Sequence, residues 1–237
     1  MKEIAVLLAL AFPLCAWSQV PGSWSASFQL PIAMEEFRET NDADIGAGAR
    51  FSFYVRPRPS SPLQAGFDIG LFGRGNAQET VPVNVAGLVN DYNVRASNNV
   101  FNLGLLLKLE PFSETRFSPY VEAALGVNNF YTQVQFYQKK RRGRGQIFDK
   151  NEDTKERWGL FYGGTAGVKI ALGKKRNGGI ELKFAYLRGA NTSYNAKPRY
   201  TSEGTLILTR LTSTTDMLIP QIGAWISFKD DDDNQND

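Results

Sequence analysis

The 237-residue chain contains no histidine, a single cysteine and no long apolar run. Without histidine it cannot build a Ser-His-Asp triad, a histidine general base or a histidine-ligated metal site. The absence of any stretch of about 18 apolar residues, with a mean hydropathy of −0.31, excludes a helical membrane protein. A disordered chain is excluded too, because 42% of the residues are hydrophobic and 12% are aromatic. The length and the net charge of +3 suit one folded domain or a small pair.

Residues 1–18 are typical of a cleaved secretory signal peptide. They open with Met-Lys, continue with an apolar run over residues 4–14, and end with Ala-Trp-Ser at 16–18. The alternative is a buried N-terminal helix or strand. Cys15 lies inside this leader, and Leu14 before it argues against lipidation. We therefore expect the mature chain to have no thiol, no disulfide and no cysteine-ligated metal.

After the leader, apolar and polar residues alternate with the period of two that is typical of β-strands. In the first segment Trp24, Ala26 and Phe28 alternate with serine and glutamine. Eight segments share this pattern, at residues 23–32, 45–56, 63–74, 101–110, 120–128, 159–172, 180–186 and 218–228. Each has roughly the ten residues that a tilted strand needs to cross a bilayer. We predict an all-β fold, an eight-stranded antiparallel up-and-down transmembrane barrel over residues 19–229.

The connectors between these segments alternate in length. Three are short (57–62, 111–116 and 173–178) and four are long (33–44, 75–98, 132–157 and 189–215). Barrels of the bacterial outer membrane have short periplasmic turns and long extracellular loops. The pattern therefore predicts the outer membrane of a Gram-negative bacterium, with both termini in the periplasm and the long loops outside.

Charged residues gather on one face of the predicted strands, and the other face is almost free of charge. A water-soluble sandwich or lipocalin-like barrel also alternates, but it seldom leaves its whole exterior uncharged. We therefore assign the charged face to the lumen and expect a polar network there, formed by Arg50, Asp68, Lys108, Glu122, Lys169, Glu181 and Lys183.

The lumen carboxylates allow two interpretations. Asp68, Glu122 and Glu181 could act as catalytic acids and bases, or they could neutralise basic side chains that a low-dielectric interior penalises by roughly several kcal/mol per unpaired ion. The second interpretation is favoured, and we predict no enzyme, no catalytic residue, no cofactor and no metal. An eight-stranded barrel is narrow, and aromatic residues that point inward would fill it and leave at most a small, sporadic conductance. These inward residues are Tyr54, Phe72, Tyr120, Phe161 and Trp225.

The last predicted strand carries the most specific motif. Gln221, Gly223, Ile226 and Phe228 match the assembly signal of outer-membrane barrels, which places a polar residue, a glycine, an apolar residue and an aromatic residue at this spacing. With the segment 118–127, the mature chain resembles the small, porin-like outer-membrane barrel family of the OmpA and OmpX transmembrane-domain type. The resemblance implies the fold, the membrane, contact with its lipid and lipopolysaccharide, and insertion by the barrel-assembly machinery. It implies no activity.

Specificity is expected in the long loops. The third loop holds a run of basic residues that would bind anions such as lipopolysaccharide phosphates, acidic glycans or an acidic partner protein: Lys139, Lys140, Arg141, Arg142 and Arg144. A solvated loop tip with no ligand is the alternative, and nucleic acid is not expected at a cell surface. In the fourth loop, residues 200–209 are β-prone and offer an edge to a partner.

Residues 230–237 form an acidic tail that follows the assembly motif. Such runs are usually solvated, but this one could dock a basic periplasmic protein. The sequence thus favours a non-enzymatic barrel with ligand-binding surface loops. The alternatives are an accessory subunit of an envelope secretion or assembly complex, and a small porin-like channel.

Overall fold

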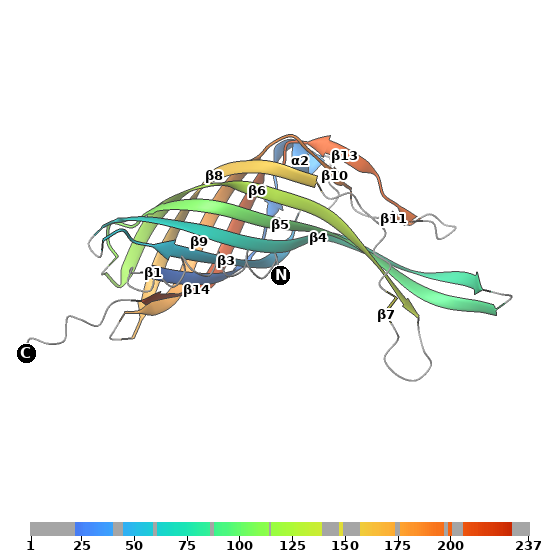
Figure 1. The fold of residues 1–237 in the computed structure, drawn as a ribbon, viewed down its shortest axis with the longest axis horizontal. Helices are drawn as coiled ribbons and strands as arrows, with labels where there is room; N and C mark the ends of the chain where they lie inside the picture. Colours follow the sequence, from blue (N-terminus) through green and yellow to red (C-terminus); the bar gives the residue numbers. More distant parts are fainter. Residues whose placement is uncertain are drawn as a thin grey trace, which may run out of the picture.

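A computed structural model describes residues 22–39, 45–58, 61–85, 88–113, 115–138, 147–148, 157–173, 176–196, 199–200 and 206–228. In this part of the chain eight strands form one closed ring (Figure 1). In order around the ring they are β1 (Gly22–Gln29), β3 (Ala47–Val55), β4 (Leu63–Val85), β5 (Leu88–Leu109), β6 (Phe117–Gln138), β8 (Arg157–Leu172), β9 (Gly178–Gly189) and β14 (Met217–Phe228).

The first and last strands of the ring close the barrel. β1 pairs with β14 in antiparallel register from Gly22 opposite Phe228 to Gln29 opposite Gln221. Closure leaves the ring without an open edge, so the backbone amides of its strands are satisfied by neighbouring strands. The eight-stranded antiparallel barrel that the sequence predicts is confirmed.

Side chains alternate across the barrel wall as the period of two requires. Along β5, Leu103, Leu105 and Leu107 point outward and are 43%, 69% and 50% exposed, whereas Asn102, Leu106 and Lys108 at the alternate positions are buried. Large apolar side chains also cover the outside of the other strands, among them Phe51, Ile69, Val121, Leu160, Phe184 and Ile222. The barrel thus has an apolar outside and buries its charged strand residues inside, the reverse of a water-soluble barrel.

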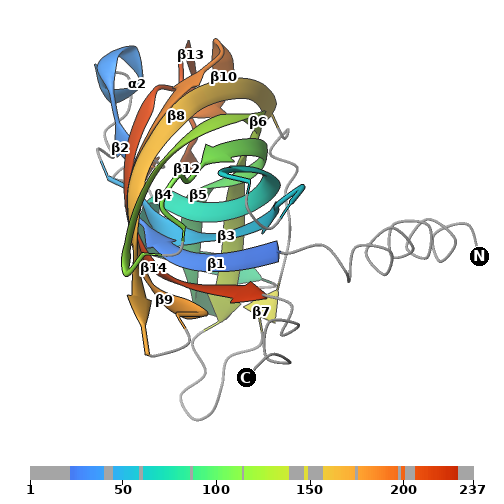
Figure 2. The same ribbon diagram turned by 90° about the vertical axis from the view of Figure 1, so that its left-hand side faces the viewer.

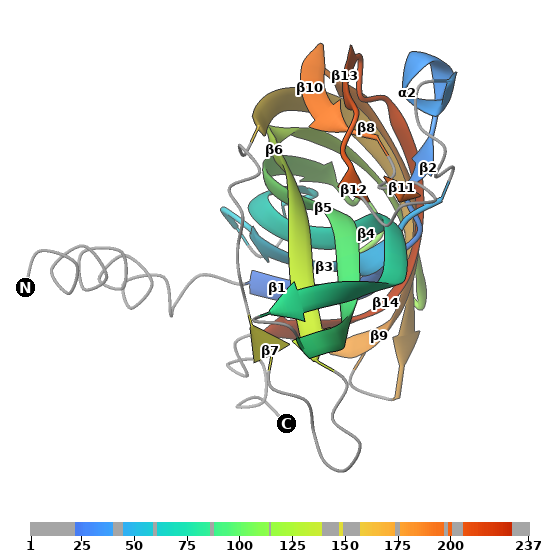
Figure 3. The same ribbon diagram turned by 90° about the vertical axis from the view of Figure 1, so that its right-hand side faces the viewer.

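The long loops contain more regular structure than the sequence indicates. Residues 75–98 do not form an irregular loop, because β4 and β5 stay paired from Asn76 opposite Ser97 to Val85 opposite Leu88. The ladder shifts register between Gly73 and Asn76, and Gly75 there has a φ of 141°, which glycine tolerates best. β6 follows this hairpin as far as Gln138, so three strands extend well beyond the ring (Figures 1 and 3).

A second group of elements lies over the long-loop end of the barrel. It includes β2 (Ile32–Ala33), which pairs with β14, the short helix α2 (Glu35–Glu39), and the hairpin of β10 (Thr192–Asn195) with β13 (Arg210–Ser213). α2, β10 and β13 lie together on one side of this end in Figures 2 and 3. Smaller pairs join β11 (Arg199–Tyr200) to β12 (Leu206–Ile207) and β7 (Ile147–Phe148) to β6.

The interior divides into two halves. Towards the short turns it is charged, and towards the long loops it is an apolar cluster that includes Phe72, Phe161, Leu187, Met217 and Ile219. No helix among the described residues is long and apolar enough to cross a membrane.

Candidate functional site: a charged lumen and an arginine-lined mouth

Glu181 on β9 is the most highly connected charge in the lumen. Its carboxylate accepts hydrogen bonds from the hydroxyls of Ser25 at 2.5 Å and Tyr120 at 2.8 Å. The ammonium groups of Lys108 and Lys183 lie 3.5 and 3.2 Å from its two oxygens. Four strands meet at this one side chain, which is fully buried.

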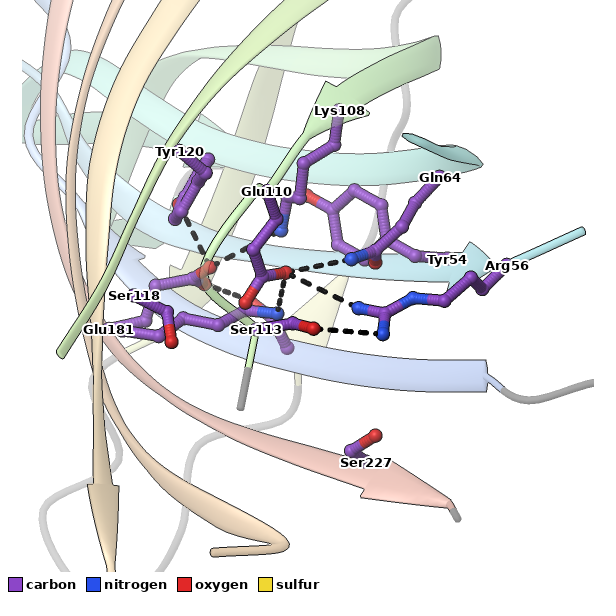
Figure 4. Close-up of polar contacts among 12 residues, drawn as sticks. Tyr54, Arg56, Gln64, Lys108, Glu110, Ser113, Ser118, Tyr120, Glu181 and Ser227 are labelled. Carbon is purple, nitrogen blue, oxygen red and sulfur yellow. Dashed lines mark hydrogen bonds and ion pairs between the residues drawn. The ribbon is translucent and has the colours of Figure 1, made fainter. Parts of the chain in front are cut away.

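A second carboxylate, Glu110, closes the short-turn end of the same network (Figure 4). It follows directly after β5, accepts a 2.7 Å hydrogen bond from the Gln64 amide and lies 2.9 Å from the Lys169 ammonium. Arg56 is 3.9 Å away and also donates to the Ser113 hydroxyl at 3.1 Å. Glu110 therefore joins the lumen charges to the turn between β5 and β6.

The other two lumen carboxylates lie on β4 and β6. Asp68 faces Arg50 across the β3–β4 pair, with Oδ2 3.1 Å from Nε, and Glu122 accepts a 2.7 Å hydrogen bond from the Tyr54 hydroxyl. Lys108 lies above the same tyrosine ring, 3.6 Å from its centroid, so the aromatic face adds a cation–π contact to the ion pair with Glu181. These side chains fill the space that an eight-stranded ring encloses.

The structure brings all seven residues of the predicted lumen network into this interior. With Glu110, the buried lumen charges form a neutral set of four basic and four acidic side chains: Arg50, Lys108, Lys169, Lys183, Asp68, Glu110, Glu122 and Glu181. A hydrogen bond of 3.1 Å from Ser27 to Gln221 connects β1 with β14 in the same layer. Neutrality stabilises the fold, because an unpaired charge in this interior would cost on the order of several kcal/mol.

Arg74 on β4 lies apart from this network, at the mouth of the barrel. Its guanidinium carbon is 4.9, 5.8 and 4.5 Å from the ring centroids of Phe37, Phe130 and Tyr194. Its Nη2 donates to the carbonyl of Asn195 at 2.8 Å, and the residue is 4% exposed. The arginine is therefore held by aromatic faces and one backbone carbonyl. Phe37, on α2, is a residue of this arrangement that the alternating sequence pattern does not predict.

A cavity of about 270 Å³ opens beside Arg74. Its lining combines three arginines from β4, β8 and β13 with amides, hydroxyls and aromatic rings, including Arg74, Arg157, Arg210, Asn98, Thr132 and Tyr194. None of the described residues that line it is acidic. The mouth therefore has a cationic recess built from the described residues, separate from the neutral lumen below it.

The residues of the predicted assembly signal lie along β14, next to the closing strand. Gln221 points inward, and Ile226 and Phe228 point outward with 56% and 53% exposure. Gly223 packs against β1 so closely that a Cβ there would come within 2.2 Å of the Ala26 carbonyl oxygen. The polar position of the motif thus lies on the inner face of this strand, the glycine lies at the contact that closes the barrel, and the apolar and aromatic positions lie on the outer face.

No family model matches the chain, and no curated protein matches it. Among solved structures it is similar to Neisserial surface protein A, with a TM-score of 0.45 and 15% identity over 87% of this chain and 97% of that one. It is also similar to Ail, the attachment invasion locus protein of Yersinia pestis (TM-score 0.40, 10% identity, 88% and 99% of the two chains). A major outer membrane protein from Thermus thermophilus gives a TM-score of 0.42 at 10% identity over 87% and 99%.

The closed ring, its largely apolar exterior and its charged interior decide the architecture. The fold is that of a small outer-membrane β-barrel. Several predicted features of this barrel lie outside the described residues, namely the signal peptide at 1–18, the acidic tail at 230–237 and the basic run Lys139, Lys140, Arg141, Arg142 and Arg144.

Proposed function

We propose that the chain is a non-enzymatic barrel of the bacterial outer membrane that binds anionic ligands with its long loops. The observation that carries this proposal is the separation of charge. The exterior is apolar, the lumen is neutral and filled, and the cationic recess lies at the loop end. Outer-membrane lipid and lipopolysaccharide then surround the barrel, and the barrel-assembly machinery is the partner that inserts it.

A catalytic role receives little support from the lumen. Each of its four carboxylates has a cation or a tyrosine hydroxyl within ion-pair or hydrogen-bond distance, as Glu181 and Glu110 illustrate. A carboxylate held in this way is a poor general base, because its charge already stabilises the fold. Within the described residues, no cluster of acidic side chains has the arrangement of a metal site.

We expect the purified barrel to conduct no steady current in a planar bilayer. The physical reason is that Tyr54, Phe72, Lys108, Phe161 and Glu181 all fill the lumen with less than 2% exposure. The measurement is single-channel recording with an empty-detergent control. Regular current steps in the purified protein, absent from the control, would favour the porin-like alternative.

The anion-binding role is tested by replacing Lys139, Lys140, Arg141, Arg142 and Arg144 together with serine. With the barrel in phosphatidylcholine nanodiscs, we expect binding of dextran sulfate at low salt to weaken about tenfold or more, and the difference to shrink at high salt because the attraction is screened. Uncharged dextran serves as the control ligand.

A control variant removes three basic charges from the short-turn end of the barrel. Arg58, Arg116 and Arg176 are exposed beside the three short turns, and their replacement by serine should leave dextran sulfate binding unchanged. If the two variants weaken binding alike, the attraction comes from net charge and the loop assignment is wrong.

A role as an accessory subunit is the second candidate, and the three-strand extension favours it. Beyond Gly73, β4 has a ladder partner on one side only among the described residues, and an edge that no described strand pairs with could take a further strand from a partner. Affinity purification from detergent-solubilised outer membranes tests this role. A stoichiometric partner that is lost on deletion of residues 230–237 would support it.

A further inference from the structure

We propose that the recess at the barrel mouth is a binding site for one acidic sugar, with Arg74 as the buried anchor for its sulfate or phosphate group. The inference rests on the proposed function, because it needs the recess to face the outside of the cell. It differs from the basic run at residues 139–144 in its residues and in the kind of ligand. That run would attract a polyanion, whereas the recess would hold one charged group.

The first argument is that Arg74 has a buried charge without an opposite charge beside it in the part of the chain that the structure describes. No carboxylate there forms an ion pair with it, and its Nε and Nη1 atoms have no hydrogen-bond partner among the same residues. Buried N–H donors are rarely left unpaired, and a buried cation without an anion is costly. The rings of Phe37, Phe130 and Tyr194 offset part of that cost through cation–π contacts but accept no proton. An oxyanion would supply both the missing charge and the missing acceptors.

The second argument is the convergence of basic side chains from distant parts of the chain. Arg157 begins β8 and Arg210 begins β13, and both line the same recess as Arg74. Three guanidinium groups gathered around one space, with no acidic side chain among its described lining residues, create a positive potential there. A guanidinium presents a planar fork of donors that matches sulfate and phosphate oxygens.

The third argument is that the wall of the recess is fixed before any ligand binds. Thr132 donates to the Asn98 amide oxygen at 2.7 Å, and Asn195 donates to the Thr132 hydroxyl at 2.8 Å. The Asn98 amide nitrogen in turn donates to the carbonyls of Asn195 and Ala196 at 3.0 and 2.8 Å. These bonds join β5, β6 and β10, so little ordering of the wall remains to be done on binding.

The size and chemistry of the recess indicate a sugar as the carrier of the charge. A volume of about 270 Å³ is just below the roughly 300–1,000 Å³ of ordinary small-molecule pockets, so a polymer does not fit inside it. The lining sets the rings of Phe130, Tyr131 and Tyr194 beside the amides of Asn98 and Asn99. Aromatic faces suit the C–H surface of a sugar ring, and amides suit its hydroxyls.

The test uses the full barrel in phosphatidylcholine nanodiscs and isothermal titration with four probes. These are N-acetylglucosamine 6-sulfate, N-acetylglucosamine 1-phosphate, uncharged N-acetylglucosamine and inorganic sulfate. We expect one saturable site for a charged sugar, and at least tenfold weaker binding of uncharged N-acetylglucosamine and of inorganic sulfate. Preference for the 1-phosphate assigns the ligand to the lipopolysaccharide of the membrane, and preference for the 6-sulfate assigns it to an external glycan; either preference supports the site.

Variants separate this site from the basic loop. Arg157→Gln and Arg210→Gln should each weaken binding of the preferred sugar about tenfold or more, because each removes a charge-assisted contact. Arg95→Gln, an exposed arginine of β5 outside the lining, should leave the affinity unchanged, and so should the five-serine variant of residues 139–144. Arg74→Lys keeps the positive charge but loses the planar fork of guanidinium donors, and it should abolish saturable binding.

Three results would overturn the proposal: no saturable binding, equal affinity for the charged and uncharged sugars, or unchanged affinity in Arg210→Gln. The last variant is informative even if Arg74→Lys fails to fold, because Arg210 is exposed. Loss of binding in the five-serine variant alone would place the site in that loop and leave the proposed function intact. Loss of dextran sulfate binding there, with sugar binding retained, would support both sites.

Discussion

Leu105→Arg should destabilise the barrel by about 2–4 kcal/mol in phospholipid vesicles, because it places a charge in the lipid near the midplane of the wall. Leu105 is the most exposed large apolar side chain of the structure's described part, at 69%, and its neighbours on the same face of β5 are Leu103 and Leu107. The measurement is the free energy of unfolding from guanidinium titrations of the protein inserted in vesicles.

The matched control is Leu109→Arg, on the same strand and the same face but at the short-turn end. There the cost should fall to roughly 0–1 kcal/mol, since the side chain can reach the interface. The lumen-facing change Gly104→Arg is an unsuitable control. Even a Cβ at Gly104 would lie 2.4 Å from the carboxylate of Asp68, and Arg50 pairs with that carboxylate. Equal stability of Leu105→Arg and wild type would contradict the assignment of faces.

Glu181→Gln should cost about 3–5 kcal/mol, the usual penalty for removing one partner of a buried ion pair. The substitution keeps the size of the side chain and one of the two oxygens that accept from Ser25 and Tyr120, but leaves the ammonium groups of Lys108 and Lys183 without their carboxylate. The measurement is the same guanidinium titration.

A double-mutant cycle distinguishes the loss of charge balance from a loss of packing. Lys108→Met removes a cation that lies 3.5 Å from Glu181 and leaves the Lys183 pair in place. The double variant Lys108→Met with Glu181→Gln should lose at least about 1 kcal/mol less than the sum of the two single variants, because removing one cation and one carboxylate keeps the lumen charges balanced. Strict additivity would show that the two charges do not interact.

Much of this fold follows from the sequence because a membrane barrel imposes a strict period of two. Leu105 and Lys108 are assigned to opposite faces by parity alone, and the structure places them so. The extension of β4 and β5 does not follow in the same way. Side chains at Gln78, Glu79 and Thr80 are polar on both faces, so the strands that leave the apolar band lose the signal that identifies strands.

The candidate sites show the same division. Parity brings Glu181 and Lys183 into the lumen, but which cation meets which carboxylate depends on the register across non-adjacent strands. The recess at the mouth combines Arg74, Arg157 and Arg210, which are separated by dozens of residues and brought together by the folds of the long loops. Only the fold itself places Phe37 against Arg74, since α2 is a five-residue helix inside a segment without alternation.

The most direct test of the account is the environment of a nitroxide spin label at Leu105. The chain from residue 19 onward contains no cysteine, so Leu105→Cys provides a single labelling site, and Arg95→Cys on the same strand provides the comparison. In vesicles we predict that the label at 105 collides more with oxygen than with a water-soluble nickel chelate, and that the label at 95 does the reverse. Greater access of the nickel chelate at position 105 would contradict the membrane-spanning, apolar-outside barrel.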